Sequence, residues 1–508
     1  MSTAQAAATG GEDFAPSIST VAGTGTAGTR GDNEPATTVQ LDVPYGIAVD
    51  SIGNLYVAEY NNHRVRKITT DGRIRTVAGT GRAGGGGDGA TAVSAQLNCP
   101  REVAVDGAGN LYITDSSNHR VRKVTADGKI STVAGTGTAG FTPDGGQASG
   151  TRLHYPLGVA VDSTGDLYIS DCNNHRVRKV TADGKISTVA GNGSAGSQGD
   201  GGPAVSAQLN GPRALSFDGA GNLYIADGDN HRVRKVTTDG KISTVAGTGT
   251  AGSSGDGGPA TDARLRLPMG VAVDSTGALY VSEYENHRVR KVTPDGKIST
   301  VAGTGTANYG GDGGPAASAL LKKPRGLAVD CVDTLYIADG DNHRVRKIAS
   351  PRMAGLPESG TVVTWANTRS KLRMAVTRES LDDGAEVHQL LAVPRDHQRW
   401  RLVATGQDNG DVLYRIENVR SGKVLEVVAE QKRPGAVVAQ RAYEGADAHH
   451  QQWRLIPVGS VADTPRVYEI ANRNSGLLLY VDTNARTVIK QHGAEGDHRG
   501  RQWQLLPV

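Results

Sequence analysis

Residues 213–247 read RALSFDGAGNLYIADGDNHRVRKVTTDGKISTVAG, a stretch that contains four short β-type segments, ALSFD, LYIAD, RVRKV and ISTVAG. GAGN joins the first two and TTDGK the last two, and Asp-Gly between β-branched residues is a strong hairpin signal. The stretch therefore predicts a four-stranded antiparallel meander. Its inner segments show little apolar/polar alternation, so both faces of the sheet are expected to be covered.

The same unit occurs six times at a fixed step, which is the sequence signature of a repeat architecture. The TVAG valine, a loop aspartate, a proline and a tyrosine all keep this step without insertion or deletion. Six sheets repeated radially cover one another, which predicts an all-β, six-bladed β-propeller. The marker histidines, each 56 residues after the previous one, are His63, His119, His175, His231, His287 and His343.

The ends of the array are complementary. ISTVAG at residues 18–23 is a fourth segment without its three partners, and RVRKI at residues 344–348 ends three segments without a fourth. Joining them closes the ring and leaves no open sheet edge. The sequence therefore predicts that an N-terminal strand completes the last blade.

Four motifs in register, NHRVRK, GDGGPA, P-x-G-(V/L)-A-V-D and TVAGTG, resemble the NHL repeat family across residues 16–350. The family's Asn-His-Leu triplet reads Asn-His-Arg here in every copy. The resemblance implies a ring-shaped propeller that is used mostly to bind proteins and, in some members, RNA.

We interpret the repeated histidine as a structural fastener, because a ligand or catalyst is usually built once while this residue is present in every blade. The acid that ends each second segment is expected to accept hydrogen bonds from the Asn-His turn. GDGGPA is expected to shape the link between blades as a capped helical turn rather than to bind calcium. The basic residues of HRVRK are expected to form a solvated, salt-bridged rim, since acids offset them and no aromatics interleave for RNA stacking.

If identity across blades marks scaffold, differences mark the candidate site. The residue after the repeated proline varies, and this loop borders the channel mouth in propellers. Arginines and aromatics at a concave mouth are typical of a recognition surface, and three arginines suit a carboxylate or phosphate, although pairing with neighbouring acids is an equal alternative. The varying ring is Tyr45, Arg101, Leu157, Arg213, Met269 and Arg325, with Asp42, His154, Tyr155, Arg266, Lys322 and Lys323 nearby in the same loop and Tyr60, Cys172 and Tyr284 in the adjacent one.

Related propellers include amidating lyases, which hold a zinc with several histidines at the channel. His154 is the only propeller histidine outside the repeated set, and one histidine cannot build a three-histidine site. No serine or cysteine nucleophile motif stands beside a base. We therefore expect no enzyme, no metal and no cofactor, with a propeller lyase or hydrolase acting at the channel mouth as the low-ranked alternative.

A second repeat of about 50 residues follows, in which HQRW, HQQW and GRQW end at Trp400, Trp453 and Trp503. Three strand-rich units of this size predict a β-trefoil. The Gln-x-Trp endings resemble the ricin B-chain lectin family over residues 361–508, with Arg501 in place of the third Gln. The tryptophans are assigned to the core.

In that family a sugar site needs an acid and a stacking aromatic. The corresponding residues are Ala375 and Leu390, Glu426 and Arg441, and Tyr480 and His492. No unit has both, which argues against a neutral-sugar lectin. Glu426 with Arg441 and Tyr443 is the remaining candidate for a weak or acidic glycan, the alternative being a trefoil used for protein contact.

The amino-acid composition limits the classes of partner and the localisation that are expected. The net charge is +3, glycine is abundant (69 residues) and aromatics make up 4%, so no global field argues for nucleic acid or membrane. Neither a secretory signal nor a membrane-spanning run is seen, which predicts a cytoplasmic monomer, with export as the alternative suggested by the lectin-like part. The expected divisions are a disordered tail (1–15), a propeller (16–350), a linker (351–360) and a trefoil (361–508).

Together these features predict a non-enzymatic binding protein. The propeller mouth would recognise a protein or a small anionic ligand, and the trefoil would add a second contact, which includes carbohydrate as a ligand class. Two weak sites on one chain combine through effective concentration. The alternatives are a lectin-like polysaccharide-binding protein, the propeller enzyme above and, at lower rank, an RNA-binding protein.

Overall fold

The computed structural model describes almost all of the N-terminal repeats and the greater part of the C-terminal region. The described residues are 16–50, 53–349, 359–367, 373–376, 379–390, 396–408, 411–428, 432, 436–445, 448–458, 467–475, 477–480, 489–492 and 502–507. The expected tail (1–15) and most of the expected linker (351–358) lie outside them.

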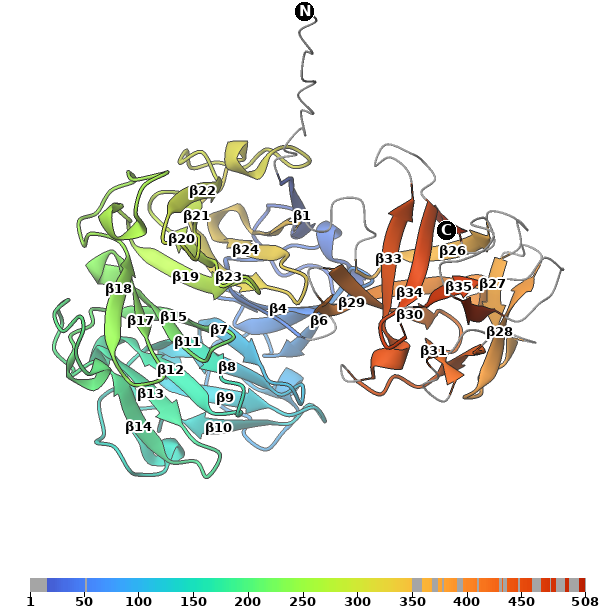
Figure 1. Ribbon diagram of the computed structural model, residues 1–508. Coiled ribbons are helices and arrows are strands. Elements are labelled where there is room, and N and C mark those ends of the chain that lie inside the picture. Colours follow the sequence, from blue (N-terminus) through green and yellow to red (C-terminus); the bar gives the residue numbers. More distant parts are fainter. Residues whose placement is uncertain are drawn as a thin grey trace, which may run out of the picture.

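The repeats form six antiparallel sheets arranged around an axis (Figure 1). The first, innermost strands are β3 (Pro44–Val49), β7 (Pro100–Val105), β11 (Pro156–Val161), β15 (Pro212–Phe217), β19 (Pro268–Val273) and β23 (Pro324–Val329). Each lies beside the first strand of the next blade, and β23 lies beside β3, so the ring is closed.

The other strands of each blade follow in sequence order. The second strands are β4 (Leu55–Glu59), β8 (Leu111–Asp115), β12 (Leu167–Asp171), β16 (Leu223–Asp227), β20 (Leu279–Glu283) and β24 (Leu335–Asp339). The third strands are β5 (Arg64–Ile68), β9 (Arg120–Val124), β13 (Arg176–Val180), β17 (Arg232–Val236), β21 (Arg288–Val292) and β25 (Arg344–Ile348). The fourth strands are β6 (Arg73–Ala78), β10 (Ile130–Ala134), β14 (Ile186–Ala190), β18 (Ile242–Ala246) and β22 (Ile298–Ala302), and the short β2 (Glu34–Pro35) extends the first sheet beside β6.

The sixth blade is completed by the N-terminal strand β1 (Ile18–Ala22), as the sequence predicted. β1 pairs antiparallel with β25, with Ile18 opposite Ile348 and Ser19 opposite Lys347. Ile18 packs in the core between the fifth and sixth blades, and Ala22 in the core between the sixth and first. The strand β1 therefore packs the sixth blade against both the fifth blade and the first blade.

Short 3-10 turns connect the strands. The links between blades contain η1 (Ala36–Thr38), η2 (Ala92–Ser94), η4 (Ala148–Gly150), η6 (Ala204–Ser206), η8 (Ala260–Asp262) and η9 (Ala316–Ser318). Turns η3 (Ser116–Asn118), η5 (Cys172–Asn174), η7 (Gly228–Asn230) and η10 (Gly340–Asn342) join second to third strands. The helical turn expected in GDGGPA is thus a single 3-10 turn, which the proline precedes and no side chain caps.

The C-terminal region is a β-trefoil. Its strands are β26 (Val362–Asn367), β27 (Arg373–Val376), β28 (Ala385–Leu390), β29 (Trp400–Asp408), β30 (Asp411–Asn418), β31 (Val424–Val427), β32 (Val438–Arg441), β33 (Trp453–Val458), β34 (Val467–Asn472), β35 (Leu478–Tyr480), β36 (Lys490–His492) and β37 (Gln502–Pro507), with turns η13 (Asp396–Gln398) and η15 (His449–Gln451). Six of them pair in a closed circle, β26-β29-β30-β33-β34-β37, and three hairpins add the rest.

The trefoil core confirms the assignment of the tryptophans. Trp400, Trp453 and Trp503 are fully buried. Their indole N–H groups donate to the carbonyls of Met374, Leu425 and Leu479, one equivalent bond in each unit.

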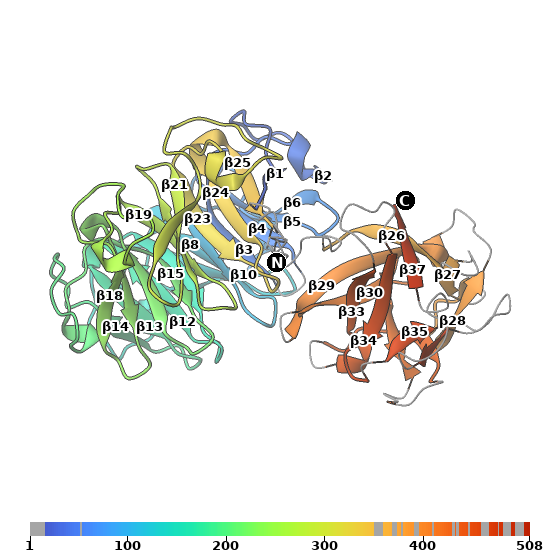
Figure 2. The same cartoon turned by 45° about the horizontal axis from the view of Figure 1, so that its top comes forward.

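A loop of the sixth blade is one place where the two parts touch. Val332, between β23 and β24, is 1% exposed and belongs to the apolar cluster of the trefoil core. The neighbouring Cys331 thiol lies 3.8 Å from the carbonyl of Ala404 in β29, the strand that faces the propeller in Figures 1 and 2. Unlike Val332, the corresponding residues of the second to fifth blades are alanine or threonine.

Candidate functional site

The repeated histidines fasten each blade to the next. The Nδ1 atom of each accepts a backbone N–H from the following blade at 3.1–3.3 Å, and the His343 to Val43 bond closes the circle. Each histidine has a positive φ, between 48° and 54°, which turns the chain from second to third strand. Burial lowers the pKa of all six imidazoles. The structure confirms the fastener interpretation and identifies the inter-blade partner.

This bond predicts a pH dependence that can be measured at one site. The pKa of His63 is lowered by burial, opposed by the charge of Asp115, so the unfolded chain binds the extra proton first. The contribution is complete above the unfolded pKa of about 6.5 and is lost as pH falls through the lower folded pKa. We expect His63→Asn, which tolerates the positive φ, to cost about 1 kcal/mol at pH 7.5 and clearly less at pH 5.5 in urea unfolding. A cost that does not change with pH would contradict the accepting role of Nδ1.

The acid that ends each second strand accepts a hydrogen bond from the asparagine of the Asn-His turn, as expected. Asn230 Nδ2 donates to Asp227 at 2.7 Å and to the carbonyl of Gly196 at 2.6 Å. The same pair of bonds recurs in all six blades. These contacts tie each turn to the link that precedes it.

The expected solvated rim is wrong for the second arginine of HRVRK. These arginines are 0% exposed in all six blades: Arg66, Arg122, Arg178, Arg234, Arg290 and Arg346. Arg234 lies between the buried Asp227 (3.6 Å) and Asp200 of the link (2.6 Å). The aspartate of GDGGPA is thus an ion-pair partner of a buried cation. The acids close to these arginines in the sequence suggested an ion-pair network at the surface. In the structure the radial packing of the blades buries the arginine side chains.

The channel-mouth ring is assembled, but two of its arginines are already paired. Arg213 donates to Asp229 at 2.8 Å and to Met269 Sδ at 3.1 Å. Arg325 donates to Asp341 at 2.8 Å. The acids follow Gly228 and Gly340, where an added Cβ would collide with the arginine side chains. On these two blades the pairing alternative holds.

Arg101 is different. Its guanidinium carbon lies 4.6, 4.8 and 5.0 Å from the ring centroids of Tyr45, Tyr60 and Tyr155. It donates to the hydroxyls of Tyr45 and Tyr155, the latter at 2.7 Å. Within the described residues no carboxylate forms an ion pair with it. We call Arg101, Tyr45, Tyr60 and Tyr155 the tyrosine cage.

The remaining ring residues form its surroundings. Leu157, Met269 and Tyr45 are 5–8% exposed, so they floor the mouth rather than protrude. His154 meets the fastener His119 edge-on, with ring centroids 5.8 Å apart. Lys322 is partly buried, and its backbone N–H donates to Asp339 at 2.7 Å.

Sequence reasoning missed Glu102, which follows Arg101 in β7. Its carboxylate accepts the N–H of Val103 at 3.3 Å and lies over Gly46 of the first blade. Burial raises the pKa of Glu102 to about 8. The signal was present: the other blades have glycine or alanine here (Gly46, Gly158, Ala214, Gly270 and Gly326), so the rule of differences would have selected it.

In the candidate glycan site of the trefoil, the side chains already bond to one another and to neighbouring residues. Glu426 is 1% exposed; its carboxylate accepts Arg441 Nε at 2.7 Å and Gln451 Nε2 at 3.4 Å, and it lies 3.6 Å from His450 Nε2. Tyr443 packs under the Arg415 guanidinium at 4.7 Å from the ring centroid. Ala375 is buried in the first unit. The side chains of Leu390, Tyr480 and His492 lie outside the described part of the structure.

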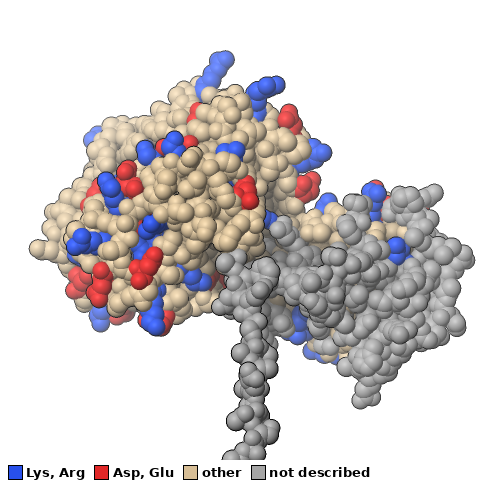
Figure 3. All heavy atoms as spheres, turned by 90° about the horizontal axis from the view of Figure 1, so that it is seen from above, with Lys and Arg blue, Asp and Glu red and all other residues tan. Residues whose placement is uncertain are grey.

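The described residues contain no group of three or more His, Cys, Asp or Glu placed to hold a metal ion, and none of their helices has the length and hydropathy to span a membrane. On the propeller face in Figure 3 basic and acidic side chains are interspersed, without a region of one sign.

Comparison with protein families finds both parts. The NHL repeat model matches residues 41–68, 153–180, 265–292 and 321–348, and the teneurin NHL domain model matches residues 82–143. The ricin-type β-trefoil lectin domain-like model matches residues 353–441 and 396–495.

Several known proteins are similar to a part of this chain. Teneurin-m of Drosophila melanogaster is 29% identical over 360 residues, 64% of this chain and 12% of teneurin-m. The human NHL repeat-containing protein 2 is 29% identical over 337 residues, 60% of this chain and 46% of that protein. A solved structure of unknown function from Bacteroides thetaiotaomicron is 21% identical, covers 66% of this chain and 76% of its own, and has a TM-score of 0.51, a likeness of fold alone. The chain thus spans less than half of either curated relative.

Proposed function

We propose that this chain, which is an NHL-repeat six-bladed β-propeller followed by a ricin B-type β-trefoil domain, is a binding protein without a catalytic role. The propeller mouth is the primary recognition surface, and its ligand is a protein or a small molecule that presents an anionic group. The trefoil provides a second contact.

The tyrosine cage carries this proposal. Arg213 and Arg325 are each neutralised by an aspartate, although Arg325 also lies over the rings of Tyr45 and Tyr284. Arg101 meets aromatic rings and hydroxyls without an ion-pair partner among the described residues. A guanidinium held between rings is pre-oriented, so a carboxylate or phosphate gains a bidentate partner without displacing an internal acid. The anionic group is therefore placed at Arg101 rather than at the whole ring.

The repeat itself supports the choice of face. Fastener histidines, turn asparagines and buried arginines occur in all six blades and hold the ring together. The cage combines residues that differ between blades, Tyr45 and Tyr60 of the first, Arg101 of the second and Tyr155 from the link before the third. Residues without a structural role shared by all six blades are the better candidates for ligand recognition.

For the trefoil we propose protein contact in preference to sugar binding. The acid that would bond sugar hydroxyls, Glu426, is buried and satisfied by Arg441, Gln451 and His450. Carbohydrate stays the second candidate because of the ricin-type family match, with Arg441, whose side chain is 41% exposed, as the group open to an acidic glycan.

Affinity capture with matched variants tests the mouth. Arg101→Leu and Arg213→Leu each introduce the residue that the third blade has at this position, Leu157. We expect Arg101→Leu to weaken a captured partner by at least about tenfold and Arg213→Leu to weaken it far less, because loss of a charge-assisted bond costs about 1.5–3 kcal/mol. Circular dichroism controls for folding. Equal recovery by wild type and Arg101→Leu would contradict the proposal.

A further inference from the structure

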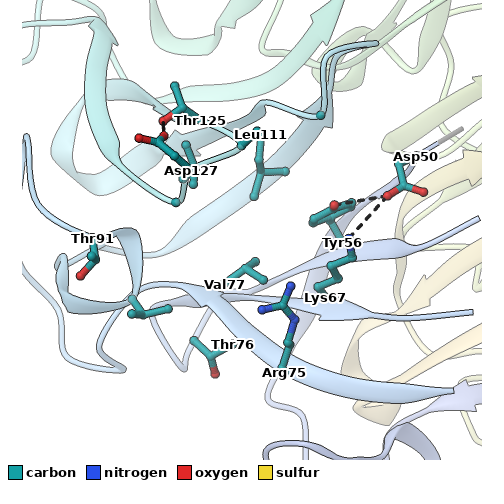
Figure 4. Close-up of a pocket in the computed structure, with 15 residues that line it drawn as sticks. Asp50, Tyr56, Lys67, Arg75, Thr76, Val77, Thr91, Leu111, Thr125 and Asp127 are labelled. Atoms are coloured by element: carbon teal, nitrogen blue, oxygen red, sulfur yellow. Dashed lines mark hydrogen bonds and ion pairs between the residues drawn. The ribbon is translucent and has the colours of Figure 1, made fainter. Parts of the chain in front are cut away.

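A groove separates the first and second blades at the end of the sheets opposite the mouth. Its volume is about 520 Å³, and it lies between β4, β5 and β6 on one side and β8, β9 and the turn after β9 on the other (Figure 4). The lining residues are Asp50, Tyr56, Lys67, Arg75, Thr76, Val77, Thr91, Val93, Gly109, Leu111, Val124, Thr125, Ala126, Asp127 and Gly128. Such a volume suits a small organic molecule.

The groove offers apolar surface next to one uncompensated cation. Val77, Leu111 and Val124 line it, and Val93 at its edge is 50% exposed. Lys67 lies 3.7 Å from Asp50, and Asp127 lies 3.9 Å from Lys129, so these charges are balanced. The Arg75 side chain has no ion pair or hydrogen bond among the described residues. Figure 4 shows it beside Lys67 on the first-blade wall, opposite Leu111 and Thr125.

Arg75 is a departure from the repeat. Every other fourth strand has serine at this position: Ser19, Ser131, Ser187, Ser243 and Ser299. Thr91, on the link that borders the groove, replaces a residue that is proline in four of the other five copies. An arginine that no blade needs for assembly, placed over apolar surface, is a feature of a site rather than of the scaffold.

We infer that this groove binds a small amphipathic anion. An apolar ring or chain packs on Val77, Leu111 and Val124, and one anionic group pairs with the Arg75 guanidinium. Charge complementarity selects the anion, since Arg75 gives the first-blade wall one positive charge more than its acids balance. The site is independent of the tyrosine cage, which lies at the other end of the blades.

Two fluorescent probes test the inference on the full chain: 8-anilinonaphthalene-1-sulfonate, an apolar ring system with one sulfonate, and N-phenyl-1-naphthylamine, its uncharged counterpart. Arg75→Ser restores the residue of the other blades and should leave the fold intact. Arg82→Thr is the matched control, because it removes an exposed arginine from the link at the opposite end of the first blade and also restores a repeat residue.

We expect Arg75→Ser to weaken binding of the sulfonate probe by about tenfold or more and to change binding of the neutral probe by less than about twofold. Arg82→Thr should leave both probes unchanged. The inference is overturned if wild type shows no saturable binding of the sulfonate probe, or if Arg75→Ser binds it as tightly as wild type does.

Discussion

Replacing Arg234 by methionine is expected to cost about 3–5 kcal/mol of propeller stability, because it leaves a buried carboxylate without its cation. Arg234 is 0% exposed and bridges Asp227, also 0% exposed, to Asp200 of the link. Burial already raises the pKa of Asp227 to about 6. Without the guanidinium, Asp227 must bind a proton or remain as a poorly compensated charge, and Asp200 loses its tie to the third strand.

Arg232→Met is the matched control in the same strand. Arg232 is partly exposed, and its Nη2 donates to the carbonyl of Thr248 at 2.8 Å. Its loss should cost about 1 kcal/mol or less. Chemical unfolding followed by far-ultraviolet circular dichroism compares the two variants. Similar costs would mean that the six buried arginines do not support the ring as their burial indicates.

Deleting residues 1–23 is expected to lower the unfolding temperature of the propeller by on the order of 10 °C and to promote association through the exposed edge of β25. The deletion removes Ile18 and Ala22, both 0% exposed, from two inter-blade cores. It also removes the Thr20 to Asp312 hydrogen bond. Deleting only residues 1–15 leaves β1 in place and should not change the transition.

The tryptophans separate the two domains in this experiment. All four, Trp365, Trp400, Trp453 and Trp503, lie in the trefoil. Tryptophan emission therefore follows trefoil unfolding, while circular dichroism follows both domains. We expect the deletion to move the dichroism transition much more than the emission transition. An unchanged dichroism transition would show that β1 does not complete the sixth blade.

Most of the architecture could be predicted from the sequence because the repeat is unbroken. The 56-residue step gave the number of blades, and the unmatched segments at residues 18–23 and 344–348 gave the closure. The Gln-x-Trp endings likewise gave the trefoil and the burial of Trp400 and Trp453. In each case only one arrangement of the strands in three dimensions was compatible with the sequence pattern.

The misses have a common physical origin, which is contact between segments that lie apart in the sequence. Arg234 looks like a surface cation in its own strand and becomes buried only when the link carrying Asp200 folds across it. The pairing of Arg213 with Asp229 depends on the space left by Gly228. Glu102 and Val332 act on the first blade and on the trefoil core, partners far away in the sequence. The sequence of a single strand does not show which distant segments will contact it.

Closure of the ring by the N-terminal strand is tested most directly by cross-linking across β1 and β25. In Ser19→Cys/Lys347→Cys the two cysteines are opposite one another, whereas Ser19→Cys/Lys291→Cys places the second cysteine at the same position of β21, which β22 already pairs. Mass spectrometry of non-reduced peptides from the monomer should find the disulfide in the first variant and not in the second. No link between positions 19 and 347, or an equal link to position 291, would contradict the closed six-bladed ring on which the mouth and the groove depend.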